Sequence, residues 1–249
     1  MASVSVIPLD AFAWLAGPDR AHVLLVGASP GHVSMLVNAG HVVTVVDQDP
    51  RAVSLLRLLY PDISVVVAAP EALPFDPGYF QTVLSVQNFH CFAPGLALAE
   101  WARVLRLGGR VSLAYLLRDD SIPWVKKLRV IIQTYLPEAM TSQYGAQSVS
   151  SLRSSPYFPF VEEVSFRLWV PCTRSQLQEN AQQAEGAAQL DPVRRTAMLD
   201  EVGQLYDQYA RAPDPLQLPY RISCWRAIVD QSMLTDVLGV EDDGLTIDI

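Results

Sequence analysis

An α/β fold with a mostly parallel sheet is the architecture that the sequence predicts, on three observations. Apolar runs rich in β-branched residues, such as HVVTVVD at 41–47, alternate along the first half with segments long enough for helices. The runs lack regular polar alternation, as expected for parallel strands covered on both faces. Gly27 follows the first run directly, as glycines do in nucleotide-binding turns. Parallel strands joined by right-handed crossovers are consistent with all three observations.

Local signals bound each element of the first half. Pro30 and Pro50 are placed in first helical turns, where the missing N–H costs nothing, and Tyr60-Pro61 stops the second of these helices. Gly108-Gly109 follows the pattern ALAEWARVLR and is expected to end that helix. The expected helices are 8–16, 30–38, 50–59 and 97–106, and the expected strands are 22–26, 41–47, 63–68, 80–86 and 110–117.

The pattern changes in the second half. Asp120 or Ser121 is expected to cap a helix that has Pro123 in its first turn and runs to about Tyr135. Two segments have the composition of strands, an alternating one at 161–170 and a last one at 220–229. Polar helices are expected between them, over 175–188 and 192–210.

Composition excludes several classes of partner. The chain has 249 residues, of which 50% are hydrophobic, and its net charge of −8 makes nucleic acid an unfavourable partner. The three cysteines are far apart and form no zinc or disulfide pattern, which favours a reducing cytoplasm and no metal site. The first basic residue is Arg20 and no apolar run approaches the roughly 20 residues of a membrane span. We therefore expect a cytoplasmic protein without a signal peptide or membrane partner.

A glycine and an aspartate at a particular spacing suggest a cofactor site. The turn between Gly27 and Pro30 leaves backbone N–H groups free to bind a ligand. Asp47 ends the second strand, and an acid at about this distance accepts hydrogen bonds from ribose hydroxyls in dinucleotide-type sites. An NAD site would also need glycine at the positions of Ser29 and His32, whereas S-adenosylmethionine has no pyrophosphate and tolerates a Cβ there better. The alternative is a tight turn next to a surface aspartate.

Several further segments resemble the class I S-adenosylmethionine-dependent methyltransferases, and in particular the bacterial small-molecule group called methyltransferase type 11. These segments are EALPF at 71–75, Gln87 with His90 after the fourth strand, ARVLRLGG at 102–109, RDDSIPWV at 118–125 and LPYRISCWRA at 218–227. The resemblance covers roughly residues 11–228. It implies a Rossmann-like, seven-stranded, mostly parallel sheet with helices on both faces and one antiparallel strand, made by the last two β segments.

The resemblance also implies which residues hold the cofactor. The methionine end is expected over 27–31, the ribose at Asp47, the adenine beside Gln48 and 70–72, and the methyl group near Gln87 and Asn88. The implied cofactor-binding residues are Gly27, Ala28, Ser29, Gly31, Asp47, Gln48, Pro70, Glu71, Ala72, Gln87 and Asn88.

The sequence departs from the family at four positions. Leu25 replaces an acid of the first strand, Ala69 replaces an acid beside the adenine, and Gln81 replaces the aspartate that starts the fourth strand. Ser29 replaces glycine and is expected to need a positive φ, at a cost of about 1–2 kcal/mol. These departures predict weak cofactor binding.

Two residues near the expected acceptor side have two interpretations each. His90 is a candidate general base for a hydroxyl or protonated-amine acceptor, or else a structural histidine at a loop. Arg118 follows the fifth strand and could hold a substrate carboxylate, whereas the alternative is that 118–120 only caps the next helix.

The sequence thus predicts an S-adenosylmethionine-dependent methyltransferase acting on a small-molecule acceptor. The alternative is a non-catalytic protein of the same fold that serves as a binding or scaffold partner. We expect a single domain over 1–249, with variable segments at about 137–158 and 173–210 covering the acceptor pocket. The acidic tail, 241–249, is expected to be dispensable for the fold, or else to pair with a sheet edge or with a second copy in a homodimer.

Overall fold

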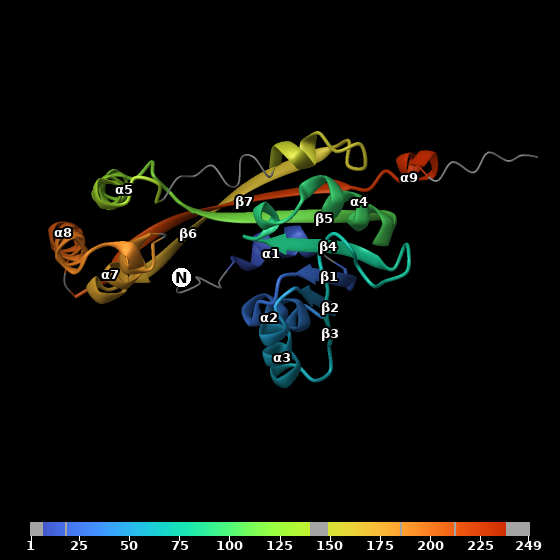
Figure 1. The fold of residues 1–249 in the computed structure, drawn as a ribbon, viewed down its shortest axis with the longest axis horizontal. Helices are drawn as coiled ribbons and strands as arrows, with labels where there is room; N and C mark the ends of the chain where they lie inside the picture. Colours follow the sequence, from blue (N-terminus) through green and yellow to red (C-terminus); the bar gives the residue numbers. More distant parts are fainter. Residues whose placement is uncertain (1–6, 18, 140–148, 185, 212, 238–249) are drawn as a thin grey trace, which may run out of the picture. The chain divides into compact units, whose positions relative to one another are not determined.

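The computed structural model describes residues 7–17, 19–139, 149–184, 186–211 and 213–237. Within these ranges seven strands form a sheet in the order β3-β2-β1-β4-β5-β7-β6 (Figure 1). The strands are β1 (His22–Val26), β2 (Val42–Asp47), β3 (Ser64–Val67), β4 (Phe80–Val86), β5 (Leu105–Arg118), β6 (Val161–Cys172) and β7 (Leu216–Ile228). The helices are α1 (Leu9–Ala16), α2 (Pro30–Asn38), α3 (Pro50–Leu59), α4 (Pro94–Val104), α5 (Pro123–Tyr135), α7 (Arg174–Gln182), α8 (Pro192–Tyr209) and α9 (Ser232–Val237), with 3-10 helices η1 (Phe89–Cys91) and η2 (Ala187–Gln189).

The first four strands form the parallel part of the sheet. β1 pairs in parallel with both β2 and β4, and β2 pairs in parallel with β3. The strand order therefore reverses between β1 and β4. Open α/β sheets bind ligands outside the carboxyl ends of strands at such a switch point. The residues that follow β1 and β4 lie at this edge.

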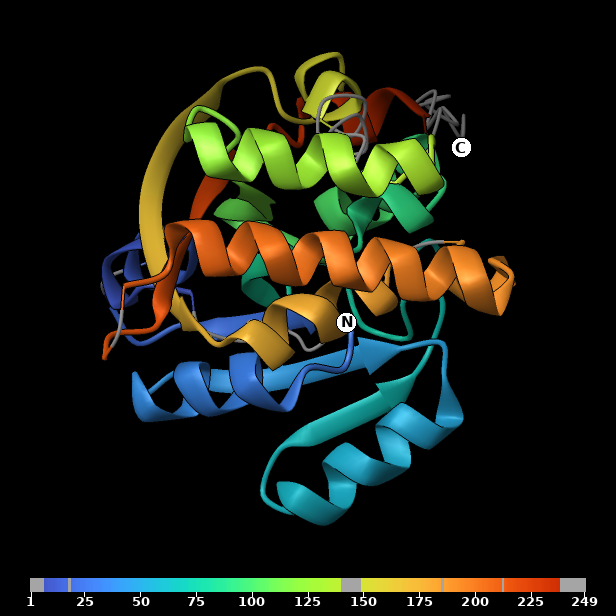
Figure 2. The same cartoon turned by 90° about the vertical axis from the view of Figure 1, so that its left-hand side faces the viewer.

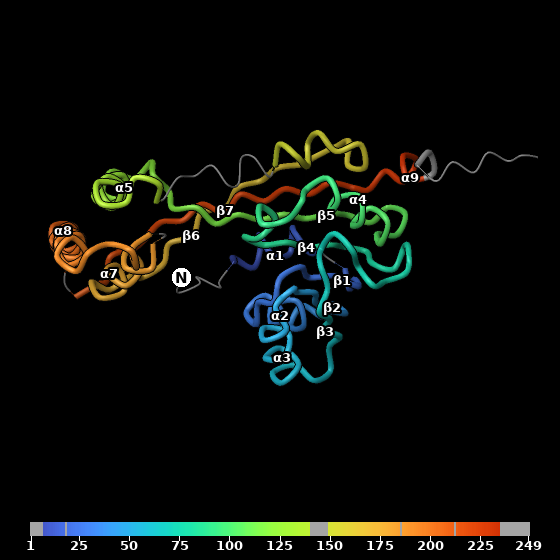
Figure 3. Tube along the Cα trace, viewed as in Figure 1, coloured from blue at the N-terminus to red at the C-terminus, as the bar shows by residue number. Residues whose placement is uncertain are grey.

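β7 runs antiparallel to its neighbours. The Val229 N–H donates to the Gly109 carbonyl and the Asp119 N–H donates to the Pro219 carbonyl, so residue numbers rise along β5 as they fall along β7. The tubes of β5 and β7 run next to each other in Figure 3. Contacts between β6 and β7, such as Ser165 with Ser223, have the same opposed order. The expected seven-stranded mixed sheet is confirmed, with its antiparallel strand contributed by the last β segment.

The chain divides into two compact units, and β5, β6 and β7 have residues in both. The parallel-sheet unit contains residues 15–113, 148–162 and 225–249, and the helical unit contains residues 1–14, 114–147 and 163–224. In the parallel-sheet unit, most side chains of β1, β2 and β4 are buried, as the continuous apolar runs predict, and the residues that are not buried lie at or near the strand ends. The expectation of one domain over the whole chain stays a prediction.

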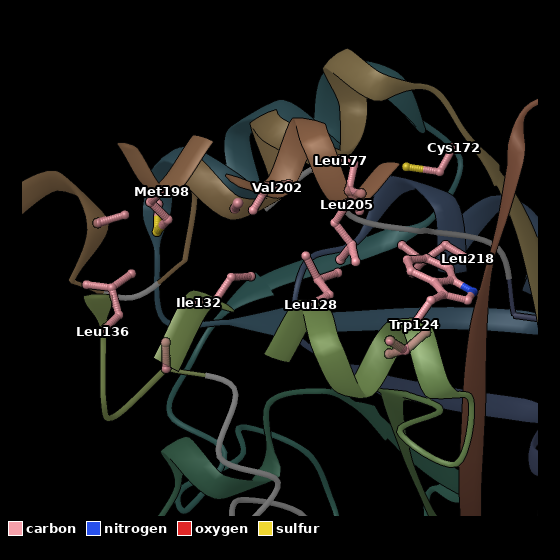
Figure 4. Packing of buried hydrophobic residues seen from close by; sticks show 14 of the residues in the cluster. Trp124, Leu128, Ile132, Leu136, Cys172, Leu177, Met198, Val202, Leu205 and Leu218 are labelled. Atoms are coloured by element: carbon pink, nitrogen blue, oxygen red, sulfur yellow. The ribbon is translucent and has the colours of Figure 1, made fainter. Parts of the chain in front are cut away.

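The helical unit has an apolar core of its own, formed by α5, α7 and α8. α8 lies beside α5 (Figure 2) and also contacts α7, and apolar side chains of the three helices meet in one core (Figure 4). Leu168 and Val170 of β6 also pack against this core. Because side chains alternate along a strand, the residues between them lie on the opposite face of β6. The labelled members of the core are Trp124, Leu128, Ile132, Leu136, Cys172, Leu177, Met198, Val202, Leu205 and Leu218.

Some expected element ends are wrong. α4 ends at Val104 and β5 begins at Leu105, so Gly108-Gly109 lies inside the strand and does not end the helix. Neither Asp120 nor Ser121 caps α5, because its N-cap is Ile122, which makes no side-chain bond. In the described part of the chain no helix is long and apolar enough to cross a membrane. The tail 241–249 and residues 140–148 of the expected variable segment lie outside the described residues.

Candidate active site

The turn after β1 has a conformation that only glycine can take without strain. Gly27 has φ +102°, and its N–H donates to the Val46 carbonyl at 2.8 Å. A Cβ added at Gly27 would collide with Asn88 Nδ2. That Nδ2 donates to the Val26 carbonyl at 2.8 Å, and Asn88 Oδ1 accepts a hydrogen bond from Ser85. Asn88, the second residue after β4, is therefore fixed against the end of β1.

The Asp47 carboxylate joins the Gly27 turn to the end of β2. Its Oδ2 accepts a hydrogen bond from the Ala28 N–H at 2.7 Å, and its Oδ1 accepts one from the Asp49 N–H at 2.8 Å. The side chain is half-buried. Each carboxylate oxygen has a further lone pair, so Asp47 can accept ribose hydroxyls while it holds the turn. The residues present therefore fit the ribose of a nucleoside cofactor.

The expectation that Ser29 needs a positive φ is wrong. Ser29 is the N-cap of α2 and has an extended conformation, with φ −116° and ψ 110°. Gly27 is the residue of the turn that has a positive φ, so Ser29 can precede α2 in an extended conformation. Tyr60 secures this start, because its hydroxyl donates to the Pro30 carbonyl at 2.9 Å. Ser29 therefore carries no backbone cost against binding.

The segment expected beside the adenine is anchored to α4. Glu71 Oε1 accepts a hydrogen bond from the Ala93 N–H at 2.8 Å, just before α4 begins. The buried Trp101 Nε1–H donates to the Pro70 carbonyl at 3.0 Å. The Ala72 N–H donates to the Ala69 carbonyl at 3.0 Å and closes a tight turn. The backbone of 69–72 is thus held in place by hydrogen bonds.

A carboxylate–guanidinium pair on α4 extends this anchor. Glu100 Oε1 accepts from the Leu73 N–H at 2.7 Å, and Arg103 donates to Glu100 and to the carbonyls of Leu73 and Phe75. The hydrogen bond from Arg103 holds the pKa of Glu100 below its usual value. The sequence segments EALPF and EWARV are therefore partners in space. Sequence reasoning missed this contact, although both segments carry the family resemblance.

Gln87 and His90, which follow β4, have properties that bear on the site. Gln87 has φ +65°, and no other non-glycine residue in the described ranges has a positive φ. Such a conformation costs about 1–2 kcal/mol, and this kind of strain clusters at functional sites. His90 lies exposed in η1, and partial desolvation lowers its pKa, which favours the neutral imidazole. Its role as a base stays a prediction.

The remaining departures from the family lie at different distances from this edge of the sheet. Leu25 is the buried penultimate residue of β1, in register with Val45 and Leu84, and lies near the Gly27 turn. Gln81 lies near the amino end of β4, where its Oε1 accepts the His22 N–H at 2.9 Å. Gln81 therefore links two strands at the far end from the Gly27 turn. Gln48 and Gly31 flank the site, Gln48 being exposed and Gly31 half-buried.

Comparison with known proteins agrees with this geometry. A family model described as a methyltransferase domain matches residues 24–113. Uncharacterised methyltransferases from Mycobacterium bovis and Mycobacterium tuberculosis are 30% identical over 234 residues, which cover 88% of each chain. A solved structure described as a type II methyltransferase from Anaeromyxobacter dehalogenans has a TM-score of 0.62 at 19% identity, covering 89% of this chain and 94% of that one. The chain therefore belongs to the class I S-adenosylmethionine-dependent methyltransferases.

Proposed function

We propose that this protein transfers the methyl group of S-adenosylmethionine to a small-molecule acceptor. The observation that carries the proposal is the Asp47 carboxylate, held at the end of β2 by the Ala28 and Asp49 N–H groups. A carboxylate at this place binds ribose hydroxyls in related sites. When bound, S-adenosylmethionine supplies an electrophilic methyl group on a sulfonium.

The chain's own residues would bind and orient. The N–H groups of Gly27, Ala28 and Ser29 bond within the protein, contrary to the expectation that the turn leaves them free. The first turn of α2 has no side-chain cap and presents its backbone N–H groups to a carboxylate, and the anchored 69–72 backbone forms a firm wall for a base. Methyl transfer depends mainly on in-line positioning, for which a rigid wall is suitable. A neutral His90 imidazole could take the proton that a hydroxyl or amine acceptor loses.

A small molecule is favoured over nucleic acid as the acceptor. The net charge of −8 opposes binding to phosphate backbones. No N-P-P-Y type tetrapeptide follows β4, where the chain reads QNFH. The non-catalytic alternative loses part of its support, because Ser29 is unstrained and Gln81 lies at the far end of its strand.

Transfer of a labelled methyl group tests the proposal. The protein is incubated with methyl-labelled S-adenosylmethionine and a library of aromatic acids, phenols and amines, and products that gain one methyl group are found by mass spectrometry. We expect product with the wild type and with Asp62→Ala, an exposed control that removes the same charge. We expect product formation to fall at least about tenfold with Asp47→Ala. Cofactor binding with no transfer to any of the acceptors would favour the non-catalytic alternative.

A further inference from the structure

Two arginines face each other on neighbouring strands of the helical unit. Ser165 of β6 lies opposite Ser223 of β7, with the two hydroxyls 3.5 Å apart. The strands are antiparallel, so two residues further along β6 Arg167 lies opposite Arg221. Leu168 packs against the apolar core, and Arg167 therefore lies on the other face of the sheet. Like charges directly opposite one another destabilise a sheet, so this pair needs an explanation.

A single buried carboxylate lies between the two guanidinium groups. Asp119, which follows β5, is 4% exposed, and its oxygens lie 3.4 Å from Arg167 Nε and 3.6 Å from an Arg221 Nη2. Asp119 also accepts hydrogen bonds from the backbone and the hydroxyl of Ser121, which hold the pKa of its carboxyl below the usual value. One carboxylate thus faces two guanidinium groups, and Asp119, Arg167 and Arg221 together carry a net positive charge.

The two arginines keep donors for a further anion. Charge-assisted N–H···O bonds are usually about 2.7–2.9 Å long, so both contacts with Asp119 are loose. The side chains of Arg167 and Arg221 are 63% and 46% exposed. Each guanidinium has five N–H donors, more than one carboxylate can accept. By contrast, Arg129 with Asp120 and Arg226 with Glu162 form closed pairs at 2.7 Å.

An apolar surface adjoins the arginine pair. Trp169 lies two residues beyond Arg167 on the same face of β6 and is 49% exposed. Ser165 lies on the other side of the pair and is exposed, and its hydroxyl is 3.5 Å from that of the buried Ser223. An oxyanion with an aromatic or apolar body would accept hydrogen bonds from the guanidinium groups and pack against the Trp169 ring.

We propose that Arg167 and Arg221, positioned by Asp119, bind the carboxylate or phosphate of a small molecule whose apolar body lies on Trp169. That the bound molecule is the methyl acceptor rests on the proposed function. Asp119 follows the carboxyl end of β5, and ligands of open α/β sheets bind outside such ends. Arg118, for which carboxylate binding is one of two interpretations, ends β5, and Arg167 and Arg221 lie on β6 and β7.

Calorimetric titration with three probes of one shape tests the site: 2-naphthoate, 2-naphthyl phosphate and neutral 2-naphthamide. We expect one or both anions to bind the wild type at least about tenfold more tightly than the amide. The double variant Arg167→Gln/Arg221→Gln should lose at least about tenfold of the anion affinity, and Trp169→Ala should weaken all three probes. Arg174→Gln is the matched control, because Arg174 is 47% exposed and pairs with Asp207 elsewhere in the helical unit.

Equal binding of the amide and the anions, or unchanged anion affinity in the double variant, would overturn the proposal. If the double variant does not fold, Arg167→Gln alone should still weaken the anions by about threefold or more, because its side chain is mostly exposed and Arg221 stays with Asp119. The arginine variants should bind S-adenosylhomocysteine normally, and Asp47→Ala should bind the anions normally. Loss of cofactor binding with intact anion binding would therefore count against the proposed function alone.

Discussion

At the scale of single residues, the candidate cofactor site depends on one backbone conformation and one carboxylate. Gly27 takes the left-handed step that lets Asn88 approach the end of β1. The Asp47 carboxylate accepts a hydrogen bond from the N–H of Ala28, the residue after Gly27, and keeps lone pairs for a ligand. Because the two interactions share the same turn, loss of either is expected to disturb the other.

Substitution of Gly27 separates backbone strain from the contact with Asn88. Gly27→Ala incurs the cost of a positive φ, about 1–2 kcal/mol, and also forces its Cβ against the Asn88 amide. Gly40→Ala is the control, since Gly40 has φ +84° but open space around its Cβ position. Denaturant unfolding should show a loss of stability for Gly27→Ala at least about 1 kcal/mol larger than for Gly40→Ala. Equal losses would mean that the Asn88 contact is unimportant.

His32 on α2 gives the stability a pH dependence. Burial lowers its pKa from 6.5 to about 4, so the unfolded chain takes up a proton at a higher pH than the folded protein does. Its contribution to stability is therefore complete above pH 6.5 and is lost as the pH falls toward 4. The loss reaches about 3 kcal/mol, because each unit of pKa difference corresponds to about 1.4 kcal/mol.

Unfolding measured between pH 7 and pH 4 checks this sign. His32→Gln should flatten the decline, whereas His90→Gln, at an exposed histidine, should keep most of it. A decline of the same steepness in His32→Gln and in the wild type would refute the assignment to His32.

Single residues differ in how far the sequence could predict them. Gly27 and Asp47 follow from local pattern and spacing, because the turn and the strand end are fixed by neighbours in the chain. The conformation of Ser29 was predicted wrongly, since it depends on which residue of the turn takes the left-handed step. The hydrogen bond from Asn88 to Val26 joins residues 62 positions apart, and it exists only because β4 lies beside β1.

At the scale of elements, α4 acts as the support of the segment after β3. Its Glu100 and Arg103 are one turn apart and together bind the backbone at Leu73 and Phe75. Arg103→Gln should lower the free energy of unfolding by about 1–3 kcal/mol, because Glu100 would keep its charge without its main partner. It should also weaken S-adenosylhomocysteine binding a few-fold by loosening 69–75.

Arg106→Gln is the matched control for Arg103→Gln. Arg106 lies exposed at the start of β5 and is not part of the Glu100 contact. Thermal unfolding and calorimetry should leave this control close to the wild type. Equal effects of the two substitutions would point to a general loss of positive charge rather than to the support of the segment.

Element types were easier to predict than element ends. Pro30 and Pro50 begin α2 and α3 as predicted, because a proline's preference for the first turn is local. Gly108-Gly109 looked like a helix stop but lies within β5, where a Cβ at Gly109 would lie 2.7 Å from the Arg106 carbonyl and 3.2 Å from the Gln81 carbonyl of β4. The contact with Gln81 is tertiary, and nothing in the nearby sequence indicates it.

At the scale of the whole molecule, the family resemblance predicted the seven-stranded sheet and its antiparallel strand. It did not predict the separate apolar core of α5, α7 and α8, because their helical periods show buried faces but not which helices share them. The sequence also did not predict that Arg167 and Arg221 lie opposite each other. They are 54 residues apart in the chain and meet only through the pairing of β6 with β7.

Calorimetric titration of S-adenosylhomocysteine into the wild type, Asp47→Ala and Asp62→Ala tests the central claim most directly. The wild type and Asp62→Ala should bind alike, and NAD should give no measurable heat with either. Asp47→Ala should bind at least about tenfold more weakly, because hydrogen bonds to a charged group are worth roughly 1.5–3 kcal/mol and 1.4 kcal/mol is tenfold. Unchanged affinity in a folded Asp47→Ala variant, or tighter binding of NAD than of S-adenosylhomocysteine, would contradict the assignment of the cofactor site to the Gly27 turn and Asp47.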